Sequence, residues 1–438
     1  MASIDYIVKA GGPLKGTMKV AGDKSISHRA VILSALAEGQ SVLTGLLEGE
    51  DVLGTVNAFR ALGVAIEGPD QGRLIVNGVG LHGLKAPAGP LDLGNSGTSM
   101  RLLAGLLCAQ GFATRLVGDE SLMKRPMERV AGPLRLMGAI IKTGREGRPP
   151  LEITGGLPLH AIRYVLPVAS AQVKSAILLA GLYAKGRTTV VEPAPSRDHT
   201  ERMLQGFGYP VARDGAAISV VGGGGPLRPG AWEVPADLSS ATFFLVAASI
   251  VPGSRLVLKR VGMNPTRSGV IAILRAMGAN IEAENETVVS GERVADLVVN
   301  AKPLHGVVIP PELVPLAIDE FPAIFIAAAC AQGTTILHGA EELRVKESDR
   351  LAVMARGLKA LGVVAEEFPD GLCVTGSPLQ GGVIDSGGDH RIAMAFAVAG
   401  LVAQAPVTVR DCRNVATSFP GFVERAQAAG FDLKVVVS

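Results

Sequence analysis

The feature that most constrains the fold is a pattern repeated six times along the chain. In each copy, a helix-like segment ends in an apolar residue and glycine, and a strand-like segment follows. The copies are about 70 residues apart, which indicates one supersecondary unit used six times. The six dipeptides are Leu62-Gly63, Met137-Gly138, Phe207-Gly208, Met277-Gly278, Leu361-Gly362 and Ala429-Gly430.

Each repeat also contains a second helix, which is rich in small residues, begins with polar ones and precedes a short β-rich stretch. The unit is therefore helix, strand, helix, strand, with extra strands in the longer gaps. Because the strand returns the chain to the surface where the first helix begins, both helix N-termini of a unit point to one side. The polar starts are Lys24-Ser25, Asn95–Thr98, Ser170–Gln172, Asp237–Ser240, Asp319-Glu320 and Asp389–Arg391.

Six such units are too many for one core, so the sequence predicts an α/β protein with three units in each of two domains. The crossing between them is expected near Val234-Pro235, just before the fourth polar-headed helix. Residues 1–20 are interpreted as a strand pair around Gly11-Gly12-Pro13 that could pair with the last unit.

Composition narrows the class of protein. Mean hydropathy is +0.35, yet the longest uncharged runs, Phe321–Ala340 and Ile392–Val409, each divide into a helix-length and a strand-length piece. They indicate buried core rather than a membrane span. A net charge of +2 and 4% aromatic residues argue against nucleic-acid binding.

The cysteines and the N-terminal residues indicate a reducing compartment. The four cysteines are scattered without a CxxC pair or a zinc-like His/Cys spacing, so we expect free thiols and no metal site. Met1–Asp5 lacks a basic region before a long apolar run, so no signal peptide is expected. We therefore expect a cytoplasmic protein.

The stretch from Gly22 to Arg29 opens an apolar helix that Ser25 or Ser27 is expected to cap and Gly39 to end. Lys24 and Arg29 lie at its N-terminal end, where the helix dipole already carries positive charge. A bound anion shared by the helix end and the two cations explains this placement. For this helix taken alone, a solvated basic cap is the preferred explanation.

The other motifs also have ordinary explanations when taken singly, such as capping or solvated turns. In a helix, Lys346, Glu347 and Arg350 would share a face, and His199 is expected at the surface. Asp319 is either a cap or a general base. Together, however, seven cations lie near one end of the repeated helices. They are Lys24, Arg29, Arg125, Arg197, Lys346, Arg350 and Arg391.

This set predicts small ligands with several negative charges, held between two half-molecules that close on binding. Nucleotide motifs are not supported. Gly78–Gly83 fits GxGxxG but no helix pattern follows it, and GxxxxGK[ST] does not occur.

The chain resembles the 5-enolpyruvylshikimate-3-phosphate synthase family of enolpyruvyl transferases along nearly its whole length. The matching segments are Gly22–Arg29, Leu93–Arg101, Lys124–Pro126, Ser170–Ser175, Ser196–Thr200, Ile318–Glu320, Glu342–Arg350 and Asp389–Arg391. The resemblance implies a two-domain inside-out α/β barrel with six βαβαββ repeats, three per domain. Residues 21–234 would form the first domain, and 1–20 with 235–438 the second.

The resemblance also implies an activity. Family members transfer the enolpyruvyl group of phosphoenolpyruvate to the 5-hydroxyl of shikimate 3-phosphate, by addition and then elimination of phosphate, in the shikimate pathway to chorismate and the aromatic amino acids. They use no cofactor. This chain would then be a cytoplasmic, monomeric enzyme of small-molecule substrates, with no nucleic-acid or membrane partner, and a target of glyphosate.

Carried over by motif, Asp319 is the expected base on the 5-hydroxyl, and Glu347 with Lys24 is expected to transfer the proton at the enol methylene. Shikimate 3-phosphate would be held by Lys24, Ser25, Arg29, Ser170, Ala171, Gln172, Arg197, Asp319 and Lys346. Phosphoenolpyruvate would be held by Lys24, Asn95, Gly97, Arg125, Gln172, Arg350 and Arg391.

The sequence departs from the family pattern at two places. Thr417 stands where many members carry a lysine, and Leu102 follows Arg101 where many have proline. With Arg197, these features resemble the branch that includes glyphosate-tolerant enzymes, although Gly97 is retained. The related transferase that acts on UDP-N-acetylglucosamine is disfavoured, because it usually has a cysteine in the loop equivalent to Asp119–Pro126. A non-catalytic or nucleic-acid-binding repeat protein is the alternative from another class.

Overall fold

The computed structural model describes residues 3–437, which divide into two compact units. The first, here called the continuous unit, contains Gly22–Val234 together with Val289–Glu292. The second, called the split unit, contains the residues up to Ala21, Pro235–Val288 and the residues from Arg293 onward. Each unit is described separately.

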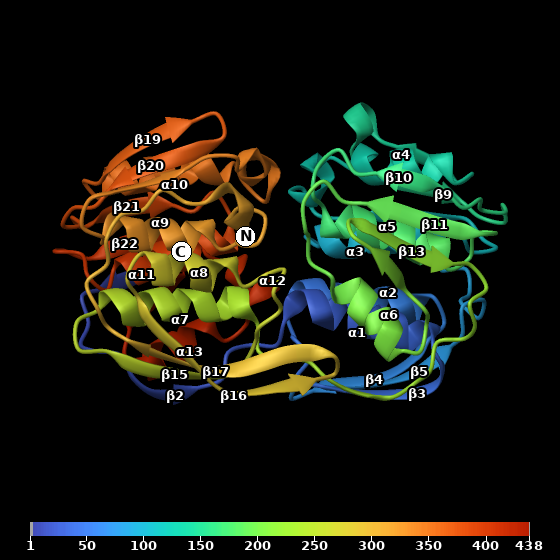
Figure 1. Ribbon diagram of the computed structural model, residues 1–438, viewed down its shortest axis with the longest axis horizontal. Coiled ribbons are helices and arrows are strands. Elements are labelled where there is room, and N and C mark those ends of the chain that lie inside the picture. The colour runs from blue at the N-terminus through green and yellow to red at the C-terminus, as the bar shows by residue number, and fades with distance from the viewer. Residues whose placement is uncertain (1–2, 438) are drawn as a thin grey trace. The chain divides into compact units, whose positions relative to one another are not determined.

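The continuous unit contains three copies of a βαβαββ arrangement (Figure 1). Its helices are α1 Lys24–Leu36, α2 Glu50–Ala61, α3 Gly97–Leu107, α4 Glu128–Leu136, α5 Ala171–Gly181 and α6 His199–Gly206. Its strands are β3 Glu38–Thr44, β4 Ala65–Asp70, β5 Arg73–Val79, β6 Leu91–Asp92, β7 Thr114–Val117, β8 Ile140–Thr143, β9 Leu151–Thr154, β10 Arg163–Val165, β11 Arg187–Val191, β12 Ala212–Asp214, β13 Ala217–Val221 and β14 Ala231–Glu233.

The split unit repeats the arrangement. Its helices are α7 Leu238–Ile250, α8 Gly269–Ala276, α9 Phe321–Ala329, α10 Arg350–Ala360, α11 His390–Ala399, α12 Val415–Ser418 and α13 Phe422–Ala429. Its strands are β1 Ile4–Lys9, β2 Lys15–Met18, β15 Arg255–Gly262, β16 Asn280–Val289, β17 Glu292–Asn300, β18 Thr334–Leu337, β19 Val364–Phe368, β20 Gly371–Thr375, β21 Gly382–Asp385, β22 Val407–Arg410 and β23 Asp432–Val437.

Each repeat builds one small mixed sheet. In the continuous unit the strand orders are β14-β3-β5-β4, β6-β7-β9-β8 and β10-β11-β13-β12, each with one parallel pair followed by antiparallel ones. In the split unit they are β16-β17-β15-β2, β18-β20-β19 and β21-β22-β1-β23. A parallel bridge between Val308 and Ile336 stands where the three-stranded sheet lacks its fourth strand. The sixfold repeat is therefore confirmed.

The glycine that follows a helix in each repeat is favoured by its backbone conformation. All six glycines of the predicted dipeptides have positive φ, from +78° at Gly362 to +111° at Gly430. This left-handed conformation ends a helix and favours glycine because a Cβ is unfavourable there. The chain then reverses into a strand, as predicted.

The core of each unit is built from the helices that begin with polar residues. In α7 the side chains from Leu238 to Ser249 are buried, and in α9 all nine residues are buried. A helix that is apolar on every side must be enclosed, and α7, α9 and α11 pack against one another while the sheets of the unit lie outside them (Figure 1).

The two long apolar runs divide as expected. Phe321–Ala340 contains α9 and β18, and Ile392–Val409 contains most of α11 and β22. Among the described residues no helix combines the length and the apolarity that crossing a bilayer requires.

The interpretation of residues 1–20 as a strand pair is wrong in part. β1 and β2 belong to different sheets. β1 lies between β22 and β23 and so joins the last repeat, whereas β2 pairs in parallel with β15. Each strand completes a repeat that lacks one strand of its own, and this burial outweighs a local hairpin.

Candidate functional site

The first cluster begins at the N-terminus of α1. Asp23, rather than Ser25 or Ser27, caps the helix, since its Oδ1 accepts from the backbone N–H of Ile26 at 2.9 Å. Ser27 instead accepts from the N–H of Leu47. The helix ends at Leu36 with Ala37 as its cap, and Gly39 lies in β3, so the predicted stop is also wrong. Asp23, two residues before Ser25 and four before Ser27, caps the helix because its carboxylate is also stabilised by the positive end of the helix dipole.

Lys24 forms an ion pair with Asp51 of α2, and its side chain remains 18% exposed. The amine is thus held in place and still reachable. Ser25, the next residue, is half-buried. The start of α1 therefore presents one accessible cation beside helix N–H groups, which is the arrangement that binds anions.

Arg29 is the buried centre of the cluster. Its guanidinium donates to Thr200 Oγ1 at 2.7 Å, to Ser175 Oγ at 2.9 Å and to the backbone oxygen of Ser25 at 2.9 Å. Burial lowers the pKa of Arg29 to about 10, and the negative charge of Glu201 opposes that shift. Arg29 therefore remains charged at neutral pH and ties α1 to α5 and α6.

A second group of residues surrounds the N-terminus of α3. Arg125 donates to Asn95 Oδ1, and Asn95 donates to Asp119 at 2.8 Å. A Cβ placed on Gly97 would lie 3.1 Å from Arg125 Nη1 and 3.2 Å from Arg101 Nη1, so two guanidinium groups approach this helix turn closely. An alanine here would require at least one of these guanidinium groups to shift.

The N-terminus of α5 joins the two groups. Ser170 caps α5, as predicted. Gln172 donates to Thr98 at 2.9 Å and accepts from Arg101. Ala171 and Arg197 are half-buried, and the positive charge of Arg197 contributes to the lowered pKa of Arg29. The continuous unit thus gathers Lys24, Ser25, Arg29, Asn95, Gly97, Arg125, Ser170, Ala171, Gln172 and Arg197 around helix N-termini.

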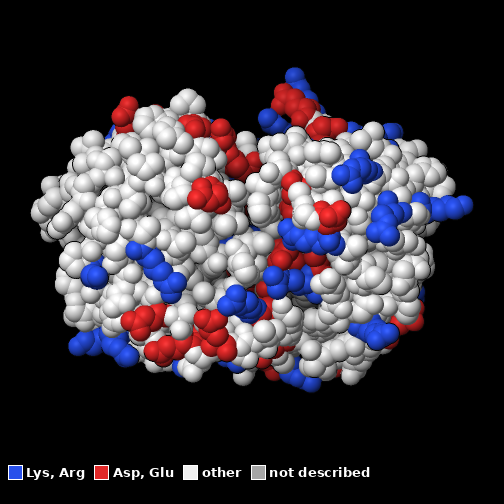
Figure 2. All heavy atoms as spheres, in the orientation of Figure 1, with Lys and Arg blue, Asp and Glu red and all other residues white. Residues whose placement is uncertain are grey.

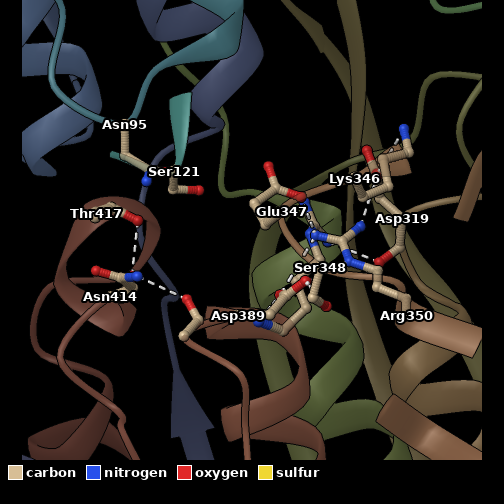
Figure 3. A network of polar contacts seen from close by, with 12 residues as sticks. Asn95, Ser121, Asp319, Lys346, Glu347, Ser348, Arg350, Asp389, Asn414 and Thr417 are labelled. Atoms are coloured by element: carbon tan, nitrogen blue, oxygen red, sulfur yellow. Dashed lines mark hydrogen bonds and ion pairs between the residues drawn. The ribbon is translucent and has the colours of Figure 1, made fainter. Parts of the chain in front are cut away.

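In the split unit the cluster forms around the guanidinium of Arg350 (Figure 3). It donates to Asp389 at 2.8 Å, to Asp319 at 3.2 Å and to Glu347 at 2.5 Å. Lys346 Nζ lies 3.4 Å from Asp319. Burial alone would lower the pKa of Arg350, but Asp389, Glu347 and Asp319 outweigh it and raise that pKa.

The side chains of the carboxylates differ in exposure. Asp319 is 15% exposed and Glu347 24%, whereas Asp389 is 0% exposed. Arg350 is shared by all three carboxylates. Asp389 is therefore a structural anchor, and the other two are accessible carboxylates that the neighbouring cations hold in place, where they can exchange protons with a bound substrate.

Lys346 and Glu347 lie before α10, which begins at Arg350, so the expectation that the three residues share one helix face is wrong. Glu347 still forms its ion pair with Arg350, because the two residues are only three positions apart. Arg125 follows a short 3-10 turn at Leu122–Lys124, and Pro126 lies just before α4, which begins at Glu128.

Arg391 is held beside the same cluster. Its Nη1 donates to the backbone oxygen of Asp319 at 3.0 Å and lies 3.8 Å from Glu320 Oε1. Asp389 caps α11, accepting from the N–H of Arg391. The split unit thus brings together Asp319, Lys346, Glu347, Arg350 and Arg391.

Thr417, which stands where many members of the resembling family have a lysine, is buried at the end of α12. Its hydroxyl donates to the backbone oxygen of Asn414 at 2.7 Å. Asn414 in turn donates to the backbone oxygen of Gly388 at 2.7 Å. The threonine thus braces the turn before α11 and adds no positive charge.

Sequence reasoning missed several buried residues that support the site. His28 contacts Thr55 at 2.8 Å, and Thr55 contacts Ser99, so one polar chain links α1, α2 and α3. Burial lowers the pKa of His28, and Lys24 and Arg29 add to that. His199, expected at the surface, is 1% exposed and lies 2.6 Å from Glu292. No local pattern marks these residues, because their partners are distant in sequence.

The two clusters are local features. On the face drawn in Figure 2, acidic and basic side chains are intermixed instead of forming one broad charged area. With a net charge of only +2, recognition of an anion depends on these clustered groups rather than on a general field.

Comparison with known proteins gives one consistent answer. The family model for EPSP synthase (3-phosphoshikimate 1-carboxyvinyltransferase) matches residues 8–426. A protein of that name from Alkalilimnicola ehrlichii is 63% identical over 98% of this chain and 96% of its own. One from Nitrosococcus oceani is 61% identical over the same shares.

Solved structures agree. EPSP synthase from Acinetobacter baumannii superposes with a TM-score of 0.89 at 55% identity, covering 99% of this chain and 100% of its own. The enolpyruvyl transferase NikO from Streptomyces tendae, at 18% identity and a TM-score of 0.80, shares the fold. The predicted enolpyruvyl transferase fold is therefore confirmed, and the chain belongs to the EPSP synthase family.

Proposed function

We propose that this chain is an enzyme that transfers the enolpyruvyl group of phosphoenolpyruvate to the 5-hydroxyl of shikimate 3-phosphate and releases phosphate. The observation that carries the proposal is the pairing of two accessible carboxylates, Asp319 and Glu347, on one buried arginine, in a chain of this family. The reaction would supply the shikimate pathway to chorismate and the aromatic amino acids.

In the addition step, Asp319 accepts the proton of the 5-hydroxyl as its oxygen attacks C2 of phosphoenolpyruvate. Glu347, with Lys24, delivers a proton to the methylene carbon, which becomes a methyl group. The product is a tetrahedral intermediate. In the elimination step, Glu347 with Lys24 takes a proton back from that methyl group, the double bond re-forms and phosphate leaves as the C–O bond to it breaks. One base, one acid and fixed cations suffice for both steps.

The residues proposed to recognise the substrates form two overlapping sets, one for each substrate. We assign shikimate 3-phosphate to Lys24, Ser25, Arg29, Ser170, Ala171, Gln172, Arg197, Asp319 and Lys346. We assign phosphoenolpyruvate to Lys24, Asn95, Gly97, Arg125, Gln172, Arg350 and Arg391. Both substrates carry phosphate and carboxylate groups, which arginine forks and helix N-termini bind. No cofactor takes part in this proposal.

The domain boundaries, cellular location, oligomeric state and partners are proposed on the same basis. The domains would be residues 21–234 and residues 1–20 with 235–438. The enzyme would act as a cytoplasmic monomer on these two small molecules, without a nucleic-acid or membrane partner.

The test is phosphate release from phosphoenolpyruvate by the purified protein, with shikimate 3-phosphate as acceptor. Turnover that requires shikimate 3-phosphate supports the proposal. Turnover with UDP-N-acetylglucosamine instead would assign the other enolpyruvyl transferase reaction, which the absence of cysteine from Asp119–Pro126 disfavours. If neither acceptor supports phosphate release, enolpyruvyl transfer is refuted.

A further inference from the structure

A lysine that the proposed mechanism does not use lies inside the continuous unit. Lys174, in the second turn of α5, has a side chain that is 0% exposed. Its ammonium lies 2.6 Å from Glu201 of α6, 3.0 Å from Glu192 just after β11 and 3.4 Å from the backbone oxygen of Ser196. An ammonium has three hydrogens, and each has an acceptor here.

These acceptors define what the lysine holds. Glu192 and Ser196 lie in the loop between β11 and α6, and Ser196 also donates from its hydroxyl to Glu192. The next residue in this loop is Arg197, assigned above to shikimate 3-phosphate. Lys174 therefore fixes the backbone immediately before that arginine.

The same lysine also sets the spacing between α5 and α6. Its neighbour Ser175 and the neighbour of Glu201, Thr200, are the two hydroxyl groups that hold Arg29. The Lys174–Glu201 ion pair thus runs beside the two hydrogen bonds of Arg29. Burial raises the pKa of Glu201 against the opposing effect of Lys174, so this carboxyl depends on the lysine for its charge.

We infer that Lys174 is a positioning residue for shikimate 3-phosphate, acting through Arg197 and Arg29 without touching the substrate. The inference rests on the proposed function. The groups that Lys174 holds, Glu192, Glu201 and Ser196, are not among the residues assigned to phosphoenolpyruvate, so the effect should fall mainly on shikimate 3-phosphate.

The experiment measures KM for both substrates in the Lys174→Met variant, with Lys185→Met as the control, because Lys185 is an exposed lysine in the turn just before β11. We expect KM for shikimate 3-phosphate to rise about tenfold and KM for phosphoenolpyruvate to change less than about twofold. The control should match the parent protein.

Removing Lys174 leaves two buried carboxylates without their cation, which strongly destabilises the folded state. Ser196→Ala provides a second test, since it removes only the hydroxyl bond to Glu192 and keeps the lysine. Its KM for shikimate 3-phosphate should rise by about twofold to fivefold, again without an effect on phosphoenolpyruvate. The double variant Lys174→Met/Glu192→Gln, with one buried charge fewer, should be more stable than Lys174→Met while keeping the high KM.

Unchanged KM for shikimate 3-phosphate in Ser196→Ala and in any folded Lys174 variant would overturn the inference. An equal rise for both substrates would also overturn it, because that result describes general damage. If the parent protein shows no turnover at all, the proposed function has failed instead, so the two failures are distinguishable.

Discussion

Arg350 Nε donates to Asp389 Oδ2 over 2.8 Å, and the two side chains are only 1% and 0% exposed. This buried pair joins the first residue of α10 to the cap of α11, and thereby places Glu347, Asp319 and Arg391 around one point. A charge removed from water this fully is stable only while its partner remains. The arrangement of the split-unit cluster therefore depends on Asp389.

We predict that Asp389→Ala lowers the free energy of unfolding of the split unit by about 3–5 kcal/mol, because it leaves the Arg350 guanidinium buried without its main partner and removes the α11 cap. Chemical denaturation followed by circular dichroism measures the change. Arg356→Ala serves as the control, because Arg356 is an exposed arginine of α10, the helix that begins with Arg350. Its free energy of unfolding should stay within about 0.5 kcal/mol of the parent. Similar losses in both variants would contradict the prediction.

The same residue predicts a dependence of stability on pH. Burial alone would raise the pKa of Asp389, but Arg350 outweighs it and the folded pKa lies below the ordinary value. Stability from this group is therefore complete above the unfolded pKa of about 3.9 and is lost as the pH falls through the lower, folded pKa. The difference in unfolding free energy between the parent and Asp389→Asn should be largest near neutral pH and shrink below about pH 4. A constant difference would exclude this origin.

Asp319→Asn should reduce kcat for phosphate release by about 10²- to 10⁴-fold, since an amide cannot accept the proton of the 5-hydroxyl. The near-isosteric change keeps an oxygen near Arg350 and Lys346, so KM for either substrate should change little. Steady-state kinetics with both substrates checks this. A kcat within a factor of two of the parent would remove Asp319 from the role of base.

Gly97→Ala should raise KM for phosphoenolpyruvate and weaken inhibition by glyphosate. Its added Cβ would come within 3.1 Å of Arg125 and 3.2 Å of Arg101, so at least one guanidinium must shift. Inhibition constants for the two proteins provide the measurement. Gly111→Ala is a matched control, because its Cβ would meet nothing within 4 Å. Equal inhibition of parent and Gly97→Ala would refute the prediction.

Arg29→Lys should raise KM for shikimate 3-phosphate by about tenfold or more while keeping the positive charge. A lysine cannot reproduce the fork that reaches Thr200, Ser175 and the backbone of Ser25 at once. The effect should be much smaller for phosphoenolpyruvate. If the KM for phosphoenolpyruvate rises instead, the assignment of Arg29 to shikimate 3-phosphate is wrong.

The parts of the fold that were predictable from sequence depend on neighbouring residues. The helix endings at the six glycines, such as Gly63 and Gly278, and the caps Ser170, Asp237 and Asp389 follow from local backbone chemistry. The pairing of β1 with β22 and β23 was only partly predictable, because it joins residues about 400 positions apart and is decided by which sheet lacks a strand.

The same distinction applies to the candidate site. Helix starts that carry cations could be recognised one by one, as at Lys24 and Arg391. The residues that contact these cations could not be recognised from the sequence, because Thr200 reaches Arg29 and Asp51 reaches Lys24 only after the helices have packed. His199 was misjudged for that reason, since a histidine at a polar helix start gives no sign of its distant partner Glu292.

The position of β1 inside the last sheet has a consequence for how the chain is made. Residues 4–9 are synthesised about 400 residues before the strands to which they hydrogen-bond. Nearly all of the continuous unit is available for folding as an uninterrupted segment during synthesis, while β1 must wait, exposed, until β22 and β23 emerge. Completion of the split unit is therefore delayed until β22 and β23 have been synthesised, and during that interval β1 is open to capture by chaperones.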